Sequence, residues 1–512
     1  MRFIKANKIS KEWLIILGLV VLKLVIHFAT NTNYELHRDA LLYYSLGDNL
    51  AWGYTSVPPL IALISKFSTV IFGNTVFALR FFPAIIGGLS VLVIAKIIKE
   101  FNGSILAIVI ASLAFILSPA FLRTNTLFQP VAFNQFFWLL SGYLIVKLIH
   151  TSNTKIWYLI FIVWGIAFLN KYSITFFIIS FLIGILFTPQ RNLLKSKDFF
   201  LGGIIGMLII LPNILWQFSN NWPLLHHMSE LQKYQLVNVS LLGFVIDQLM
   251  MNFPGLIIWI TGLIVFLFFK TEKKYRVLVY IYLLTVLIII LLRGKSYYTL
   301  GLYPILFAMG GYAIDKYFKN YFKYLSIAFI IMASIPMLPL SLPIFSHEKL
   351  EEYITENNLA EFTNRWEDGV IHNLPQDYAD MTGWKELSSI VINFYNSMSP
   401  AEKKDCIIYA GNYGQAGAIK FYGKKYGLPE PISFSDNFLL WAPDTIKNAP
   451  MLFIEHEIDD IEFLYKNYEE IGQVNNKYFR ENGLKVFYCT EPKDTFKLFY
   501  AKKVKALRNI YH

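Results

Sequence analysis

One stretch near the start of the chain decides the fold class: Glu12-Trp-Leu-Ile-Ile-Leu-Gly-Leu-Val-Val-Leu-Lys-Leu-Val-Ile-His-Phe-Ala-Thr30. A run of about 18 or more apolar residues is long enough to cross a lipid bilayer as a helix. Ten further runs of this kind follow, so the sequence predicts a mostly α-helical, polytopic membrane bundle of about eleven spans. The predicted spans are residues 12–30, 76–97, 104–121, 129–149, 156–170, 172–188, 199–217, 250–269, 276–292, 297–314 and 322–345.

The composition agrees with a membrane protein. Of 512 residues, 55% are hydrophobic and only 16% are charged, whereas a soluble domain carries about 25% charged residues. Two cysteines exclude a disulfide-rich scaffold and a multi-cysteine metal cluster. The net charge of +11 would suggest a nucleic-acid partner in a soluble protein. Here we expect the charge to set membrane topology, and we predict no nucleic-acid partner.

The charge divides the chain into two predicted domains. Residues 1–345 carry a net charge of +17 and residues 346–512 a net charge of −6. We therefore predict a transmembrane domain at 1–345, with its boundary near residues 343–347, and a soluble domain at 346–512. Short apolar runs at 406–410, 451–455 and 485–489 predict buried strands, and 415–426 predicts a helix. The second domain is therefore expected to be α/β.

The positive-inside rule orients the bundle. With the N-terminus in the cytoplasm, the predicted inner segments contain 18 Lys and Arg residues and the outer segments contain 8. This bias holds only if residues 58–73 form an interfacial helix and do not cross the membrane. Eleven spans then place the C-terminal domain outside the cytoplasm. We interpret the first span as an uncleaved anchor, since Lys23 interrupts it and no convincing cleavage site follows.

The outer loop at 31–75 collects acidic residues directly after the first span. It contains Glu35, Asp39 and Asp48, with His37 and Arg38 beside Asp39. Apolar cover favours the protonated form of a carboxyl group unless the group is paired, which suits a general base for an acceptor hydroxyl. The alternative is that Asp39 only forms an ion pair with Arg38 or another outer cation.

Other outer loops add cations and aromatic residues. Arg293 and Lys295 lie in a tight turn, where they could grip phosphate or could simply extend to the membrane surface. His226 and His227 could bind substrate or a metal, but adjacent histidines point apart on a helix, so a metal would need further ligands. A solvated loop is the alternative for them.

Two features of the tail leave alternatives open. Gly411-Asn-Tyr-Gly414 follows a predicted strand and could be a tight turn, or could contact phosphate or glycan at a helix N-terminus. Cys406 and Cys489 share the oxidising side of the membrane and could form a disulfide, or could be two buried thiols.

These loops resemble a known group of membrane enzymes. The resemblance is carried by Tyr34-Glu-Leu-His-Arg-Asp39, Leu46-Gly-Asp48, Trp52-Gly-Tyr54 and Pro58-Pro-Leu-Ile-Ala-Leu63, and by Gln129-Pro-Val-Ala-Phe133 and Gly294-Lys-Ser-Tyr-Tyr298. In the tail, Leu374-Pro-Gln-Asp-Tyr-Ala-Asp-Met-Thr-Gly-Trp384 and Gly411-Asn-Tyr-Gly-Gln-Ala-Gly-Ala418 continue it. In this order, the motifs resemble the C-type (GT-C) membrane glycosyltransferases. More closely, they are similar to the bacterial protein O-mannosyltransferase and aminoarabinose transferase-like family, glycosyltransferase family 39.

The resemblance implies a function and a site. It implies a sugar donor on a polyprenyl phosphate, presented at the outer side of the cytoplasmic (inner) membrane, and a lipid, protein or glycan acceptor. It implies that Asp39 is the general base or positions the acceptor, and that cationic and tyrosine residues at the membrane edge hold the lipid phosphate. The residues expected to bind substrate are Glu35, His37, Arg38, Asp48, Arg123, His226, His227, Arg293, Lys295, Tyr297 and Tyr298.

Two departures from the family pattern matter. Many relatives have a second acid directly after the loop aspartate, where this chain has Ala40. Aminoarabinose transferases have Glu-Lys before the Pro-Pro pair, where this chain has Ser56-Val57. The second departure argues against an aminoarabinose transferase in the narrow sense. It also removes a candidate metal or phosphate ligand, so no metal ligand is assigned, although a divalent metal stays an open option.

A single displacement with inversion at the anomeric carbon needs a base and a stabilised leaving group but no enzyme nucleophile. We therefore expect an inverting glycosyltransferase. The alternative from another class is a lipid or glycan transporter of the cell envelope. Transporters carry ionisable residues near the middle of the membrane and paired repeats, and this sequence shows Lys23 nearly alone inside its spans.

Overall fold

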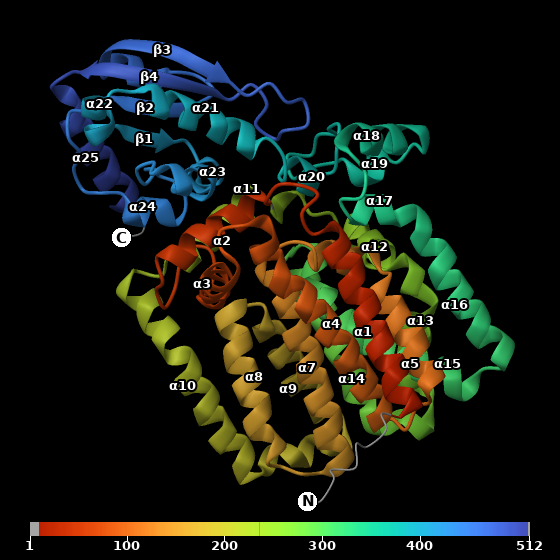
Figure 1. Cartoon of the computed structure of the whole chain (residues 1–512). Coiled ribbons are helices and arrows are strands. Elements are labelled where there is room, and N and C mark those ends of the chain that lie inside the picture. Colours follow the sequence, from red (N-terminus) through yellow and green to blue (C-terminus); the bar gives the residue numbers. More distant parts are fainter. Residues whose placement is uncertain (1–9, 235, 510–512) are drawn as a thin grey trace, which may run out of the picture. The chain divides into compact units, whose positions relative to one another are not determined.

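The structure is a computed structural model that describes residues 10–234 and 236–509. By its internal packing, the chain divides into two compact units (Figure 1). Unit 1 contains Met1–Asn31, Arg80–Pro212 and Leu236–Ile344, and unit 2 contains Thr32–Leu79, Asn213–Gln235 and Phe345–His512. Unit 2 therefore joins the first outer loop to the C-terminal segment. The predicted domain boundary after residue 345 stays a prediction.

Unit 1 is built from apolar helices, and each predicted span contains one. The helices that belong wholly or mainly to this unit are α1 (Lys11–Thr30), α4 (Val76–Glu100), α5 (Ile105–Ile116), α6 (Pro119–Thr124), α7 (Pro130–Thr151), α8 (Ile156–Asn170), α9 (Ile174–Leu186), α10 (Lys197–Ser219), α12 (Leu241–Met250), α13 (Leu256–Phe268), α14 (Arg276–Leu291), α15 (Tyr303–Tyr317), α16 (Asn320–Ser334) and α17 (Leu338–Ser341). Short 3-10 turns connect several of them: η1 (Pro189–Lys195), η2 (Leu236–Asn238), η3 (Phe253–Gly255), η4 (Lys270–Tyr275), η5 (Ser296–Leu302) and η6 (Ile335–Met337).

Among the described residues, fewer than eleven helices are long and apolar enough to count as complete membrane spans. In the described part of the chain, six helices are long and apolar enough to cross a membrane, or up to eight if each of two bent pairs is one span. The bent pairs join α9 to η1 at 116° and α12 to η3 and α13 at 71°. α5 and α8 are apolar but have only 12 and 15 residues. The predicted count of eleven therefore stays a prediction.

The ends and contacts of these helices follow from local sequence. The Ser104 side chain caps α5 by accepting from the N–H groups of Leu106 and Ala107. Gly262 on α13 faces Gly310 on α15, and a Cβ at Gly262 would lie 2.7 Å from the Gly310 nitrogen. Small residues let apolar helices approach closely, as they do in membrane bundles.

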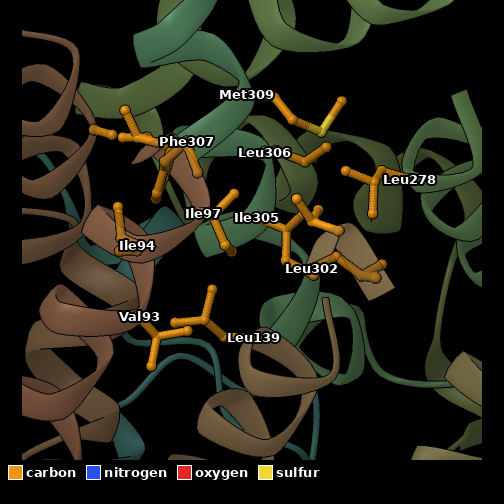
Figure 2. Packing of buried hydrophobic residues seen from close by; sticks show 14 of the residues in the cluster. Val93, Ile94, Ile97, Leu139, Leu278, Leu302, Ile305, Leu306, Phe307 and Met309 are labelled. Carbon is orange, nitrogen blue, oxygen red and sulfur yellow. The ribbon is translucent and has the colours of Figure 1, made fainter. Parts of the chain in front are cut away.

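The core of unit 1 is a continuous cluster of buried apolar side chains. Figure 2 shows part of it, where side chains of α4, α7, α14, η5 and α15 point toward one another. Ile97 and Phe307 are fully buried there. Burial of this kind stabilises a helix bundle through close packing.

The first outer loop forms two helices in unit 2. These are α2 (Arg38–Asp48) and α3 (Leu60–Phe72), and they pack closely where Gly47 meets Ser65. α3 leaves Phe67 and Val70 more than half exposed. A short helix with one packed and one exposed apolar face agrees with the predicted interfacial helix, although its place in a membrane stays a prediction.

The C-terminal segment contributes a four-stranded sheet of order β1-β2-β4-β3 to unit 2 (Figure 1). β1 (Ile407–Ala410) pairs parallel with β2 (Met451–Glu455), whereas β4 (Lys485–Pro492) pairs antiparallel with β2 and β3 (Tyr465–Gln473). In register, Met451 lies opposite both Ile407 and Cys489. Three of these strands match the prediction. Strand β3 was not predicted, because this edge strand is mostly exposed and its residues do not alternate between apolar and polar.

The helices of the C-terminal segment precede, separate and follow these strands along the chain. They are α18 (His347–Glu356), α19 (Ala360–Thr363), α20 (Gln376–Ala379), α21 (Trp384–Ser397), α22 (Pro400–Asp405), α23 (Tyr413–Gly423), α24 (Asn437–Trp441) and α25 (Thr495–Arg508), with 3-10 turns η7 (Lys424–Tyr426) and η8 (Asp459–Phe463), while α11 (Pro223–Tyr234) comes from the middle segment. The predicted helix at 415–426 corresponds to α23 and η7.

The two cysteines are buried free thiols. Burial raises the pKa of Cys406 to about 11 and that of Cys489 to about 12. The disulfide that the sequence left open is therefore not formed in this structure.

Candidate functional site

Asp39 lies in the first turn of α2, and the local sequence fixes its position. His37 is the N-cap of α2, and its side chain accepts from the Asp39 N–H at 3.1 Å. The preceding loop is held by the Arg38 N–H, which donates to the Asp380 carbonyl at 3.0 Å. A carboxylate at a helix N-terminus is favoured by the helix dipole. The Asp39 side chain is 32% exposed, so solvent and substrate can reach it.

The residues facing Asp39 come from the C-terminal segment. The Tyr413 hydroxyl donates to Asp39 Oδ1 at 3.0 Å. The Arg38 guanidinium lies 4.4 Å from the centre of the Tyr413 ring, which is a cation–π distance. α2 and α23 approach closely because Gly414 and Gly417 have no side chain: a Cβ on Gly417 would lie 2.8 Å from the Leu41 carbonyl oxygen.

This packing explains the glycines of the tail motif. Asn412 caps α23 by accepting from the N–H groups of Gly414 and Gln415. The motif therefore forms a self-capped turn after β1, which is the simpler of the two predicted roles. The glycines let the helix approach the helix that carries Asp39.

His37 is buried beside three carboxylates. Its Nε2 lies 3.6 Å from Asp377 and 3.5 Å from Asp380, and its Nδ1 lies 3.9 Å from Asp39. Burial alone would lower the pKa of His37, but the nearby carboxylates of Asp377, Asp39 and Asp380 raise it overall. His37 therefore ties α2 to the carboxylates of the C-terminal segment.

Asp380 pairs with Arg480 as well as lying beside His37. It is buried, and Arg480 donates to both of its oxygens at 3.1 and 3.2 Å. Burial raises its pKa, although His37 and Arg480 oppose the rise. Asp377 and Asp380 were not predicted as site residues. Both lie in the tail motif at 374–384, so the family resemblance of this motif is the signal that could have identified them.

Asp436 is a second carboxylate near Asp39, and the sequence did not predict it. It caps α24 with a positive φ of 51°, and its carboxylate accepts from the Asn437 N–H at 2.7 Å. Positive φ is uncommon outside glycine and often marks functional positions. Burial raises the pKa of Asp436, whereas Ser56 and His227 lower it and Asp39 raises it.

Two phenols link Asp39 and Asp436. Burial raises the pKa of both Tyr43 and Tyr413, and the charges of Asp39 and Asp436 raise both further. Unit 2 therefore brings together the predicted residues Asp39, His37, Arg38 and His227 with the unpredicted carboxylate. His226 precedes His227 on α11 and is half-buried.

Glu35 and Asp48 have well-defined structural partners. Glu35 accepts from the Lys385 N–H in the first turn of α21 at 3.0 Å, and burial raises its pKa. Asp48 at the end of α2 pairs with Lys66 at 3.1 Å and with Lys424 at 2.9 Å. Burial would raise the pKa of Asp48, but these two hydrogen bonds lower it. Their predicted substrate contacts stay predictions.

Unit 1 holds the predicted cations and tyrosines. Lys171 lies 5.6 and 5.3 Å from the ring centres of Tyr297 and Tyr298, and these two rings meet edge to face at 4.8 Å. Lys295 precedes η5, and it lies next to Ser296, whose hydroxyl donates to Asp247 at 2.7 Å. Lys171 was not among the predicted site residues, because only the fold brings it to the two tyrosines.

The two arginines of unit 1 lie in different surroundings. Arg123 on α6 donates to the Leu340 carbonyl. Arg293 follows α14 with a φ of 52°, is exposed, and lines a cavity of about 320 Å³ together with Leu241 and Phe244. Arg123 thus connects α6 to α17, whereas Arg293 is accessible to solvent.

The metal ligands were left open by the sequence. Within residues 10–234 and 236–509, no group of three or more His, Cys, Asp or Glu side chains is arranged to hold a metal ion. The structure therefore assigns no metal ligand, and the role of a divalent metal stays untested.

Comparisons with known proteins find similarity to membrane glycosyltransferases. Residues 56–216 match the family model described as dolichyl-phosphate-mannose-protein mannosyltransferase. A lipid A galacturonosyltransferase, RgtD of Rhizobium johnstonii, is 22% identical over 229 residues, which cover 44% of this chain and 48% of that protein. The chain thus matches about half the length of this curated relative.

The fold has close counterparts among solved structures. The crystal structure of ArnT from Cupriavidus metallidurans bound to undecaprenyl phosphate has a TM-score of 0.64 at 12% identity, covering 94% of this chain and 98% of that one. Its apo structure has a TM-score of 0.62 with the same coverage. The family model and the curated relative support the resemblance to C-type membrane glycosyltransferases that the loop motifs predict, and the two solved structures show that the chain shares the ArnT fold.

Proposed function

We propose that this protein is an integral-membrane glycosyltransferase that moves a sugar from a polyprenyl-phosphate donor to an acceptor outside the cytoplasm. The observation that carries the proposal is the position of Asp39, which is accessible at a helix N-terminus and faces two phenols and a second carboxylate. The relatives support the donor class, since one solved neighbour is described with bound undecaprenyl phosphate. The relatives also support a membrane-embedded, multi-pass protein of the bacterial inner membrane.

Asp39 acts as the general base in this proposal. A carboxylate that accepts the proton of an acceptor hydroxyl turns the hydroxyl into a stronger nucleophile. The oxygen attacks the anomeric carbon, the bond from this carbon to the phosphate oxygen breaks, and the phosphate leaves with the electron pair. This single displacement inverts the anomeric configuration and forms no covalent bond to the enzyme.

Asp436 is the second carboxylate of the proposal. Two carboxyl groups near each other separate their roles, because the more buried one keeps its proton to higher pH. The raised pKa of Asp436 suits a hydrogen-bond donor to a sugar or acceptor oxygen. Asp39 then remains the group that receives the proton.

The donor phosphate is assigned to the cations of unit 1. A departing phosphate needs positive charge and hydrogen-bond donors, and Lys171, Lys295, Tyr297 and Tyr298 supply both. Arg293 is a further accessible guanidinium. We assign Arg123 a smaller part in phosphate binding, because it already donates to a backbone carbonyl.

The orientation is part of the proposal. The N-terminus faces the cytoplasm, and the C-terminal segment lies outside with Asp39. The excess of cations in the predicted inner segments supports this topology.

Cell-free transfer tests the proposal. The purified protein in detergent is given a polyprenyl phosphate carrying a labelled sugar, together with an envelope lipid extract. Label should move to an acceptor, and Asp39→Asn should abolish most transfer, whereas Asp405→Asn, at an exposed ion pair with Lys447, should not. A transporter needs a sealed membrane, so activity only in vesicles would contradict the proposal.

The stereochemistry is a second readout of the same assay. The anomeric configuration of the product, measured by NMR coupling constants, should be opposite to that of the donor. A glycosyl group trapped covalently on Asp39 would overturn the single-displacement mechanism.

A further inference from the structure

A cavity in the C-terminal part of unit 2 lies apart from the residues assigned to glycosyl transfer. It has a volume of about 180 Å³ and is bounded by one face of β1 and β2, by η8 and by α25. Protein interiors contain few voids larger than a water molecule. An apolar cavity of about 150 Å³ binds a benzene-sized ligand. The volume therefore suits one ring with a small substituent.

Most of the cavity wall is apolar, and the charged residues that line it are Glu455 and Lys503. Ile407, Met451 and Leu464 supply aliphatic surface, and Phe453 and Phe496 supply aromatic surface. A free sugar would leave most of its hydroxyl groups unpaired against such walls, which is costly. The walls favour an apolar body.

One side of the cavity is polar. Tyr500 is 5% exposed and lines the cavity, and its hydroxyl is buried without a hydrogen-bond partner in the described part of the chain. Burial raises the pKa of Tyr409, and the nearby Glu455 and Tyr500 raise it further, so these three groups lie together. A buried polar group without a partner is uncommon in native proteins and points to a bound water or ligand.

Two neighbouring residues position Glu455 at this polar side of the cavity. Its Oε1 accepts from the His456 N–H at 3.2 Å. Its Oε2 occupies the space that a Cβ on Gly411 would need, so a side chain at position 411 would displace the carboxylate. The glycine that opens the turn after β1 thus also makes room for a carboxylate beside the cavity.

We propose that this cavity binds a small amphiphile, a single aromatic or cyclic aliphatic ring that carries a hydroxyl or amine group. The ring fills the apolar space between the sheet and α25. Its polar group hydrogen-bonds to the Tyr500 hydroxyl and to the Glu455 carboxylate. The site is separate from Asp39 and does not depend on the proposed glycosyl transfer.

Ligand-observed ¹⁹F NMR on the full-length protein in lipid nanodiscs tests the site. The probe is 4-fluorophenol, fluorobenzene is the comparison without a hydroxyl group, and empty nanodiscs correct for partition into lipid. We expect saturable broadening of the 4-fluorophenol signal and weaker binding of fluorobenzene. No saturable signal above empty nanodiscs, or equal binding of the two probes, would overturn the proposal.

Variants place the binding in the cavity. Ile407→Phe fills the space and should abolish binding, and Phe499→Trp fills it from α25 if the first variant does not fold. Tyr500→Phe should weaken 4-fluorophenol binding by about 3-fold to 10-fold, the effect of one hydrogen bond, and leave fluorobenzene binding unchanged. Leu498→Phe, at a residue of α25 that is 59% exposed, is the matched control. Unchanged binding in a folded Ile407→Phe or Phe499→Trp protein would contradict the site.

Discussion

The two ends of α2 carry the same side chain in opposite surroundings. Asp39 at the first turn faces Tyr413 and lies near the second carboxylate Asp436. Asp48 at the last residue pairs with Lys66 and Lys424. Being an aspartate in the outer loop is therefore not enough to identify a general base. The partners distinguish the two residues: Asp39 lies beside the Tyr413 hydroxyl and the buried His37, whereas Asp48 lies between two lysines.

The largest expected difference between the two ends is in transfer. Asp39→Asn should lower the rate by about 10²-fold to 10⁴-fold, the contribution of a general base, with an unchanged fold. Asp48→Asn should lower it by less than about 10-fold, because the Asp48 carboxylate already pairs with Lys66 and Lys424. Cell-free transfer at equal protein concentration measures both, and equal losses would remove the distinction.

Asp436 should show an intermediate effect. Asp436→Ala removes the hydrogen-bond donor, and we expect a loss of about 10-fold to 100-fold, the effect of one strong hydrogen bond. Asp436→Asn is the matched control, because asparagine keeps a hydrogen-bond donor, caps helices and tolerates positive φ well. An Asp436→Ala protein with full transfer would exclude Asp436 from the site.

His37 gives a pH-dependent effect on stability. Its pKa is raised in the folded protein, so its contribution is fully present below the unfolded value of about 6.5 and is lost as the pH rises through the raised value. His37→Gln should lower the Tm at pH 6 by about 3–8 °C, and the difference should shrink at alkaline pH. His372→Gln, at a surface pair with Asp368, is the control. A larger difference at alkaline pH would contradict the assignment.

Asp48 should give the smallest effect, with the opposite pH dependence. Its pKa is lowered in the folded protein, so its contribution is present above about 3.9 and is lost as the pH falls through the lowered value. Asp48→Asn should lower the Tm at pH 7 by about 2–4 °C, consistent with roughly 1 kcal/mol. Scanning calorimetry or intrinsic fluorescence measures this shift, and no change at pH 7 would show that the pairs with Lys66 and Lys424 contribute nothing.

The sequence predicted most helices and part of the site, for physical reasons. Apolar runs identify helices such as α1 because lipid-facing surface must be apolar along its length. Helix length is less predictable: α5 ends at Ile116 although the apolar run continues, because Pro119 starts a new helix. Asp39 could be proposed as a site residue from local motifs, since α2 and its cap are local structure.

The remaining site residues depend on long-range packing. Asp436 lies nearly 400 residues after Asp39 in an unremarkable stretch, Ser433-Phe-Ser-Asp-Asn437. Only the fold of unit 2 brings it near Tyr413. Lys171 meets Tyr297 and Tyr298 for the same reason. No local sequence pattern indicates these long-range contacts, so they could not be predicted from a single sequence.

The most direct test of the central claim compares envelope glycans and glycolipids by mass spectrometry. Cells carry the wild-type protein, Asp39→Asn or Asp48→Asn at equal abundance. We predict that one glycan or glycolipid loses a defined sugar mass with Asp39→Asn and keeps it with Asp48→Asn. A profile unchanged by Asp39→Asn but altered by full deletion of the gene would contradict the assignment of Asp39 as the base.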